Sequence, residues 1–417
     1  MARVRFLTPC LFALALVALL GAPAGAVPPD PASAVAYLDA QQVAGTDATA
    51  GAGSWDEDTG FGLSEFSTTE VVLAIASAAQ SGGSWNPTEA RIAVETTVNG
   101  DGLNALAYLD DLAQGGLSPA EAGKLLLLVA LPLDDDTAGF DPAAWDPAGD
   151  GSPVDLVAAL GGCADVTDYG FFGQTTVAMQ AVAVLCGQAG PAATQTVRDA
   201  QQDNGGWSFD GDPSGATEAE IDVTAMAMLA LVAGGVRGDD PAMLDGLAYL
   251  AERQTADGWW ASLFDPASPD ATSRALLAIV AAGWDPATPA WRDHVLPQAA
   301  GTPYVSPDDG LGALQQGDGS IVGPTTFSAV YSTAQSVQAT ERTWLPVATT
   351  TAPSLDDSVG PPPDPDAPGE PEGVAGDVVE PDSGATLPRT GAPALPLALA
   401  GLGAITTGAV LLRMRRA

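Results

Sequence analysis

The carboxylates at the starts of two strongly apolar runs are the residues best placed to do chemistry. Glu220 and Asp222 stand in the run Glu-Ile-Asp-Val-Thr-Ala, and Asp270 stands before Ala-Thr-Ser. A carboxylic acid at such a position can donate a proton to a bound substrate. A carboxylate at such a position also caps a helix by accepting backbone N–H bonds, and we favour this second interpretation for Asp222 and Asp270.

Aromatic side chains gather in the turns before these runs and at their starts. They are Trp55, Phe61, Phe66, Tyr169, Phe171, Phe172, Trp207, Phe209, Trp259, Phe264 and Phe327. If they converge with the carboxylates, they form an aromatic pocket with an acidic rim, which suits an apolar ring system or a glycan face. The residues assigned to this ligand site are Trp55, Tyr169, Trp207, Phe209, Glu220, Asp222, Trp259 and Asp270. The alternative is that most of the aromatic rings pack the turns of the fold.

Composition and charge exclude several other kinds of site. The 417 residues include 52 Asp and Glu but only 14 Lys and Arg, for a net charge of −38, which excludes a basic nucleic-acid surface. His294 is the single histidine, so no His-rich zinc or iron site can be assembled, and no metal ligands are assigned. Calcium stays open, at the loop from Asp210 or through Asp146 and Asp150, although Ile221 stands where an EF-hand loop needs Glu.

A helical repeat from about residue 28 to residue 346 positions these residues. One unit has Gly246-Leu-Ala-Tyr-Leu, then Gln254, then Gly258-Trp-Trp, and the preceding unit has Gln201 and Gly205-Gly-Trp. The second, strongly apolar helices of the units are predicted to open near Ser67, Ser118, Gln174, Asp222, Asp270 and Thr325. This period of about fifty residues predicts six helical hairpins in an all-α fold, with apolar helices inside and amphipathic helices outside.

The pattern Gly-x-x-Tyr-Leu-x-x-x-Gln-x-x-x-Gly-x-Trp of residues 246–260 resembles the QW repeat of squalene and other triterpene cyclases, without its leading basic residue. The resemblance implies an (α/α)6 toroid, which these cyclases share with protein prenyltransferase β subunits, cobalamin carriers and complement thioester domains. The proton donor of the cyclases, in Asp-x-Asp-Asp-Thr-Ala, falls on Asp222, but Glu220 and Val223 replace the first and third Asp. The Gln and Trp residues of the motif, namely Gln201, Trp207, Gln254 and Trp260, are interpreted as structural.

Two of these relatives lack their required residues here. His294 has no Cys beside it for a prenyltransferase zinc site, and Cys186-Gly-Gln-Ala189 has Ala where a thioester needs Gln. Residues 222–227, Asp-Val-Thr-Ala-Met-Ala, are identical to an inner-helix segment of bacterial proteins similar to the cobalamin carriers. Cobalamin therefore stays open as a ligand, although the small β domain of the carriers is replaced by an acidic segment.

The N-terminal end of the chain predicts export. Residues 1–26 have the charged, apolar and small-residue order of a secretory signal peptide. Cys10 leaves with this segment, so Cys163 and Cys186 remain in an oxidising compartment, and we expect them to form a disulfide.

The C-terminal end predicts attachment to a cell wall. Leu387-Pro-Arg-Thr-Gly391, the apolar stretch 392–412 and the terminal arginines resemble the LPXTG sorting signal of Gram-positive surface proteins. The resemblance implies that a sortase cuts between Thr390 and Gly391 and joins the protein to peptidoglycan, with only transient contact with the membrane. The expected order is a signal peptide (1–26), the toroid (27–347), a disordered acidic Pro-rich stalk (348–386) and the sorting signal (387–417).

Three functions are consistent with this organisation. We favour a secreted, wall-anchored surface protein whose toroid binds a small ligand or a partner without catalysis. The rivals are a divergent terpene cyclase-like enzyme that uses Asp222 as its general acid, and a structural spacer or adhesin.

Overall fold

The computed structural model describes residues 27–55, 64–80, 85–134, 141–161, 181 and 191–343. Side chains are described from residue 67 in the second of these ranges and from residue 193 in the last. The chain divides into two compact units, Met1–Ser358 and Val359–Ala417, and all of the described residues belong to the first.

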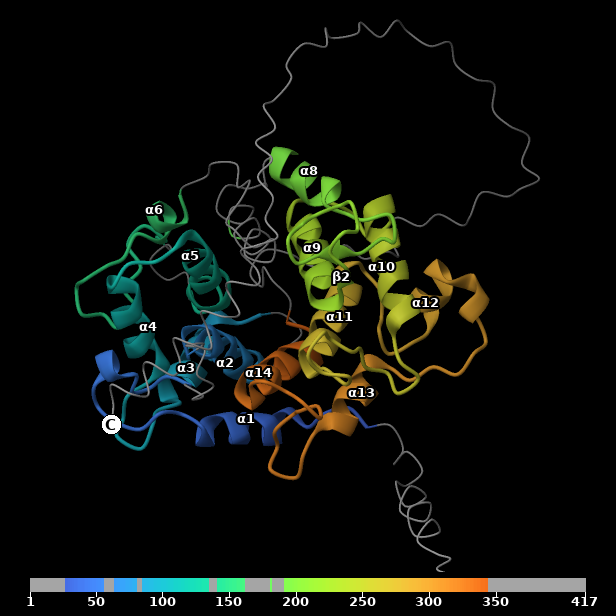
Figure 1. Cartoon of the computed structure of the whole chain (residues 1–417). Helices are drawn as coiled ribbons and strands as arrows, with labels where there is room; N and C mark the ends of the chain where they lie inside the picture. Colours follow the sequence, from blue (N-terminus) through green and yellow to red (C-terminus); the bar gives the residue numbers. More distant parts are fainter. Residues whose placement is uncertain are drawn as a thin grey trace, which may run out of the picture. The chain divides into compact units, whose positions relative to one another are not determined.

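Helices make up most of the described structure (Figure 1). The α-helices are α1 (Pro31–Ala40), α2 (Ser64–Ala78), α3 (Pro87–Thr96), α4 (Ala105–Gln114), α5 (Pro119–Leu125), α6 (Leu156–Leu160), α8 (Pro191–Asp199), α9 (Ile221–Ala233), α10 (Pro241–Arg253), α11 (Pro269–Ala281), α12 (Ala290–Val295), α13 (Pro307–Leu314) and α14 (Ala329–Thr340). Leu126–Ala130 continues α5 as a π-helix, and Ala48–Ala50 and Pro297–Ala299 are 3-10 turns. The strands of the described residues are β1 (Trp207–Ser208) and β2 (Ala219–Glu220), an antiparallel pair. The all-α prediction is confirmed for this part of the chain.

The described helices form an inner and an outer layer. Inside, α9 packs on α11, α11 on α14, and α14 on α2 (Figure 1). Outside, α1 covers α14 and α2, α10 covers α9, and α13 covers α11. The inner helices are buried on most sides; in α9, all but one of the residues from Val223 to Val232 are buried. The predicted hairpin around Gln174 lies mostly outside the described residues, so closure of the layers into a toroid stays a prediction.

Six helices begin with the same local signal, a short polar residue followed by proline. These pairs are Asp30–Pro31, Asn86–Pro87, Ser118–Pro119, Asp240–Pro241, Ser268–Pro269 and Ser306–Pro307. Each polar side chain accepts a backbone N–H of the first turn, as Ser268 does from Ala271 N at 3.2 Å. Proline suits the next position because it lacks the N–H that would have no partner there, and its fixed φ is helical. These starts therefore follow from sequence local to each helix.

A repeated threonine fixes each turn to the inner helix that follows it. Thr224 Oγ1 accepts the backbone N–H of Trp207 at 3.0 Å, and Thr272 Oγ1 accepts that of Trp260 at 3.0 Å. The same bond joins Trp55 N to Thr68 Oγ1 at 3.1 Å, and Ile321 N to Thr333 Oγ1 at 2.9 Å. The four threonines lie within the first five residues of inner helices, and all of them are buried.

The glutamines of the repeat hold neighbouring units together. Gln201 Nε2 donates to Gly205 O at 2.8 Å and to Ala242 O of the next helix at 2.9 Å. Gln254 Nε2 donates in the same way to Gly258 O at 3.0 Å and Val305 O at 3.3 Å. Each side chain thus satisfies carbonyls in two successive units, consistent with the structural interpretation of the motif.

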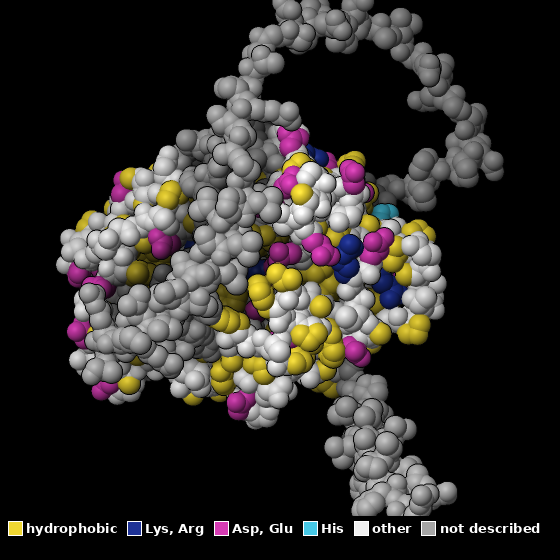
Figure 2. Space-filling view, in the orientation of Figure 1, with side chains coloured by type: hydrophobic (Ala, Val, Ile, Leu, Met, Phe, Trp, Pro, Cys, Tyr) yellow, Lys and Arg dark blue, Asp and Glu magenta, His cyan; other side chains and the backbone are white. Residues whose placement is uncertain are grey.

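The predicted inner-helix starts agree with the structure to within a few residues. The starts predicted near Ser67, Ser118, Asp222, Asp270 and Thr325 correspond to α2, α5, α9, α11 and α14. Acidic side chains are spread over the visible surface and outnumber the basic ones (Figure 2).

Candidate functional site

A cluster of charged side chains lies among the apolar inner helices. The Glu70 carboxylate of α2 lies 3.2 Å from Lys124 Nζ of α5 and 3.8 Å from Arg274 Nη2 of α11. The side chain of Glu70 is only 6% exposed, against 12% for Lys124 and 21% for Arg274. Buried charges are costly unless they are paired, so the two cations and the carboxylate depend on one another.

Helix α14 completes this cluster with two polar side chains. Arg274 Nη2 donates to Tyr331 OH at 2.7 Å, and Lys124 Nζ lies 5.4 Å from the centre of the Tyr331 ring. Gln338 Nε2 donates both to Glu70 Oε2 and to the backbone oxygen of Glu70, at 2.9 Å each. The charged cluster of Glu70, Lys124, Arg274, Tyr331 and Gln338 therefore joins helices from both ends of the repeat array.

The charges set the protonation states within the cluster. Burial raises the pKa of Glu70, but the positive charges of Lys124 and Arg274 outweigh it, and the net pKa lies below the ordinary value. Burial lowers the pKa of Arg274, but Tyr331, Glu70 and Asp222 together hold it above the ordinary value. Burial also raises the pKa of Tyr331. Glu70 and Arg274 are therefore ionised at neutral pH, and Tyr331 is neutral.

Asp222 and Asp270 are two further carboxyl groups of the site, and nearby positive charge compensates their burial only in part. Burial raises the pKa of Asp222, and Arg274 offsets only part of the rise. Burial raises the pKa of Asp270 to about 7, with the negative charges of Asp222 and Glu70 adding to the rise. Oδ1 of each carboxyl is buried without a hydrogen-bond partner. Near neutral pH, Asp270 therefore readily carries a proton, and Asp222 holds a proton more tightly than an ordinary aspartate does.

Two polar side-chain atoms of α14 are also buried without a hydrogen-bond partner. Ser332 Oγ and Gln335 Oε1 are buried and have no hydrogen-bond partner. The Ser332 hydroxyl is close enough to Asp270 to lower its pKa, but it does not reach hydrogen-bonding geometry. Unpaired buried polar atoms each cost about 1–3 kcal/mol, so several of them on packed inner helices need a reason.

Four side chains of the site remain partly accessible to solvent. Asp222, Asp270, Arg274 and Tyr331 are only partly buried although they lie on the inner helices, and burial is the main cause of the raised pKa values of Asp222, Asp270 and Tyr331. Polar groups in such a position can contact water or the polar groups of a ligand.

The predicted helix-capping role of Asp222 and Asp270 is wrong. The N-cap of α9 is Glu220, whose side chain makes no capping bond, and the N-cap of α11 is Ser268. Both aspartates lie inside the first turn, where an acid also favours the positive end of the helix dipole. Glu220, Asp222 and Asp270 are close enough to interact electrostatically. Burial is the largest cause of the raised pKa values of Glu220 and Asp270, and the negative charge of Asp222 raises both of them further.

Of the predicted aromatic residues that the structure describes, the tryptophans pack in the fold and Phe209 is exposed. Trp55 is 1% exposed and Trp207 is fully buried, and their indole N–H groups donate to Leu38 O and Val197 O, both at 2.6 Å. Trp259 is partly buried against the core, whereas Phe209 is 44% exposed on the surface. The described tryptophans therefore pack the turns, and Tyr331 supplies the aromatic ring beside the charged cluster.

Five residues of the charged cluster were not among the residues predicted for the site. Glu70, Lys124 and Arg274 each stand directly before the apolar run of an inner helix, and a charge at that position was the available signal. Their partners Tyr331 and Gln338 lie on a different helix, far along the chain. No local pattern links them.

Several predictions concern residues outside the described ranges. They are the ligand residue Tyr169, the disulfide Cys163–Cys186 and the sortase cleavage between Thr390 and Gly391. Within the described ranges, no helix is long and apolar enough to cross a bilayer.

The carboxylates of the loop that starts at Asp210 accept hydrogen bonds from donors within the same loop. Asp210 accepts from Ser208 Oγ at 2.8 Å, Thr217 Oγ1 at 2.6 Å and Asp212 N at 3.2 Å. Asp212 accepts from the backbone N–H and hydroxyl of Ser214, at 2.9 and 2.7 Å. These internal hydrogen bonds close the loop on itself, in agreement with the poor match to an EF-hand.

Comparison with known proteins gives matches of structure only. No family model matches the chain, and no curated protein matches it. The structure is similar to that of the type II terpene cyclase MstE from Scytonema without ligand, with 16% identity, a TM-score of 0.47 and coverage of 75% of this chain and 96% of that one. A single-residue variant of MstE in complex with merosterolic acid A, described as its product, gives 17% identity, a TM-score of 0.45 and coverage of 75% and 95%.

Proposed function

We propose that the described domain binds a small molecule rich in hydrogen-bond donors, without catalysis, at the partly accessible side chains of Asp222, Asp270, Arg274 and Tyr331. The observation that supports this function best is the group of unpaired buried polar atoms on α9, α11 and α14: Asp222 Oδ1, Asp270 Oδ1, Ser332 Oγ and Gln335 Oε1. Hydroxyl, amide or amino groups of a ligand would satisfy these acceptors and remove their desolvation penalty.

Charge favours a polar ligand over a hydrocarbon one. Arg274 and Lys124 bring two fixed positive charges to the inner helices, where both lie within 4 Å of the Glu70 carboxylate. An apolar chain would desolvate these groups further without replacing their hydration. Oligosaccharides and cobalamin, whose corrin carries amide side chains, are therefore better candidates than heme or a sterol.

Ligand panels with matched variants test this function. The purified protein would be screened with oligosaccharides, cobalamin, heme and sterols by thermal shift, and hits measured by calorimetry. A ligand at one hundred times its Kd stabilises the folded state by about 2.7 kcal/mol. Asp222→Asn and Asp270→Asn should weaken a true hit, whereas Asp245→Asn, on the exposed face of α10, should not. A panel without hits, or a hit that all three variants bind equally, would leave a spacer or adhesin as the better account.

Catalysis by Asp222 is the second candidate. Burial keeps the Asp222 carboxyl protonated to a higher pH than an ordinary aspartate, so a proton is available there. The raised pKa also makes it a weaker acid, and the neighbouring Arg274 would repel a carbocation. Turnover of a polyprenoid by the wild type, lost in Asp222→Asn but kept in Asp245→Asn, would establish the enzyme; no turnover by the wild type would eliminate it.

We also propose that the protein is secreted and anchored to a Gram-positive cell wall by a sortase, on the basis of the Leu387–Gly391 pentapeptide and the apolar and basic residues after it. Thr390→Ala should release the protein from the wall into the medium or leave it in the membrane fraction. Full wall attachment of this variant would refute the proposal.

A further inference from the structure

A second acidic group lies away from the charged cluster, between α4 and the loop that precedes α6. One carboxylate oxygen each of Asp110, Asp146 and Asp150 lies within 4.8 Å of the others. Asp110 belongs to α4, whereas Asp146 and Asp150 belong to the loop. Calcium binds oxygen ligands at about 2.4 Å, so two ligands of one ion are separated by up to about 4.8 Å. The three oxygens are thus as close as the ligands of a shared ion must be.

Asp110 is the member of this group that most needs a partner. It is only 3% exposed, and its Oδ1 atom is buried without any hydrogen bond. Its other oxygen accepts from Gln114 Nε2 at 2.7 Å. Burial, and then the negative charges of Asp150 and Asp146, raise the pKa of Asp110. A buried carboxylate that faces two others, with one oxygen unpaired, is costly unless a cation joins the group.

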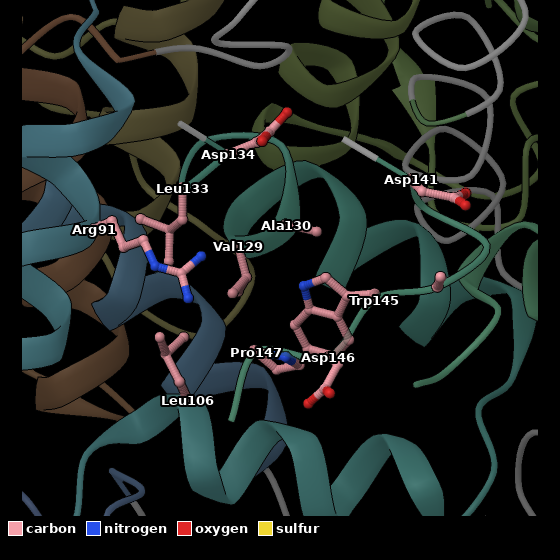
Figure 3. A pocket seen from close by; sticks show the side chains of 11 residues that line it. Arg91, Leu106, Val129, Ala130, Leu133, Asp134, Asp141, Trp145, Asp146 and Pro147 are labelled. Atoms are coloured by element: carbon pink, nitrogen blue, oxygen red, sulfur yellow. The ribbon is translucent and has the colours of Figure 1, made fainter. Parts of the chain in front are cut away.

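The described residues do not supply that cation. None of the ion pairs in the described part of the chain includes Asp110, Asp146 or Asp150. Arg91 lies nearby, in a pocket of about 220 Å³ that Asp146 also lines, but its Nε is paired with Glu95 Oε1 at 2.7 Å (Figure 3). Figure 3 shows Arg91 and Leu106 on one side of this pocket and Trp145 on the other.

The loop holds its two carboxylates in place. Backbone hydrogen bonds between Trp145 and Val154, at 3.0 and 2.8 Å, close the loop at its base. Asp146 accepts three backbone N–H groups, from Gly149 at 2.8 Å, Asp150 at 3.1 Å and Gly151 at 2.9 Å. Gly149 and Gly151 have φ values of 69° and 87°, which glycine adopts without strain. The loop is therefore ordered around Asp146 by its own backbone.

We propose that Asp110, Asp146 and Asp150 bind one calcium ion, which ties the loop of residues 146–153 to α4. Three carboxylates suit a hard cation, and the mixture of a helix residue with loop residues gives calcium the irregular geometry that it tolerates better than magnesium does. Water and backbone oxygens would fill the remaining coordination positions. The proposal is independent of the ligand proposed for the inner helices.

Calorimetric titration of the full chain with calcium, after removal of metal by a chelator, tests the proposal. We expect one site with a Kd of about 0.1–1 mM and a higher unfolding temperature in calcium. Asp110→Asn and Asp150→Asn should each weaken binding at least about tenfold. Asp111→Asn is the matched control, since it removes the same charge from the neighbouring position of α4, and its affinity should stay within about twofold.

Terbium luminescence sensitised by Trp145 gives a second readout, which Asp110→Asn should abolish and calcium should compete away. Circular dichroism in chelator establishes that the variants fold; if Asp110→Asn fails to fold, the exposed Asp150→Asn carries the test. The proposal is overturned if the wild type binds no calcium at millimolar concentration, if magnesium binds equally tightly, or if Asp111→Asn weakens binding as much as Asp110→Asn.

Discussion

A single amide group, Nε2 of Gln338, donates to both the side chain and the backbone of Glu70 at 2.9 Å, across 268 residues of sequence. The two residues lie on α14 and α2, the last and the first of the described inner helices, which pack against each other. Glu70 in turn is paired with Lys124 and Arg274. The contact between the ends of the repeat array thus also positions the central charge of the site.

Replacement of Gln338 by Met should therefore destabilise the domain by about 1–3 kcal/mol, because it removes both hydrogen bonds to Glu70, including one to its buried carboxylate, at nearly constant shape. Chemical denaturation would measure the loss in free energy of unfolding. Gln335→Met is the matched control, since Gln335 is equally buried on α14 but its Oε1 has no partner to lose. Equal losses in the two variants would mean that the bonds to Glu70 contribute nothing specific.

Removal of the Glu70 charge should be more damaging. Glu70→Gln keeps the shape of the side chain but leaves Lys124 and Arg274 without their anion, and breaking a buried pair in this way costs about 3–5 kcal/mol. Glu95→Gln breaks the exposed pair with Arg91 and should cost less than about 1 kcal/mol. Denaturation of both variants at neutral pH makes the comparison, and losses of similar size would argue against a structural role for the buried cluster.

Asp270 should make stability depend on pH. Its folded pKa of about 7 lies above the ordinary value of 3.8, so the folded state binds the proton more tightly than the unfolded state does. The contribution is fully present below about pH 4 and is lost as the pH rises to about 7. Asp270→Asn removes this loss, so the variant should be more stable than the wild type at pH 8, by up to a few kcal/mol, and similar to it at pH 4.

Thermal unfolding across this pH range, with Asp245→Asn as the exposed control, measures the effect. The difference between Asp270→Asn and the wild type should grow between about pH 4 and pH 7 and then stay constant. A constant difference over the whole range would show that Asp270 is an ordinary, solvated carboxylate.

The helical repeat could be predicted from the sequence because its signals are local. A cap residue followed by proline, as in Ser268–Pro269, and a Gln and a Trp at fixed distances lie within single turns or hairpins. The same locality explains the error at Asp270, because an acid two residues after the true cap resembles a cap in sequence alone. The Ser268–Pro269 pair was the signal that separates the two.

The site could be predicted only in part, because its contacts are not local. Asp222 and Asp270 were recognised from their positions at helix starts, but the partners of Glu70 come from α5, α11 and α14. Which helices pack together is decided by the tertiary fold, and no spacing along the chain encodes it. The tryptophans were assigned to the site because they stand in the turns before the inner helices. Their position is instead explained by packing and by hydrogen bonds from their indole N–H groups to carbonyls of outer helices.

The threonine of each inner helix gives the sharpest test of the repeat. Thr272 Oγ1 accepts the N–H of Trp260 at 3.0 Å and donates to Ser268 O at 2.7 Å, and all three residues are buried. Thr272→Val keeps the shape of the side chain but leaves a buried N–H without an acceptor, which should cost about 1–3 kcal/mol and expose the Trp260 amide to faster hydrogen exchange. Thr272→Ser keeps the hydroxyl and should retain most of the stability and the protection of that amide.

Thr288→Val is the control for this comparison, because it changes an exposed threonine and should shift stability by less than about 0.5 kcal/mol. If Thr272→Ser is as damaging as Thr272→Val, the methyl group rather than the hydrogen bond stabilises the turn, and the bonds at Thr68, Thr224 and Thr333 would need the same reinterpretation.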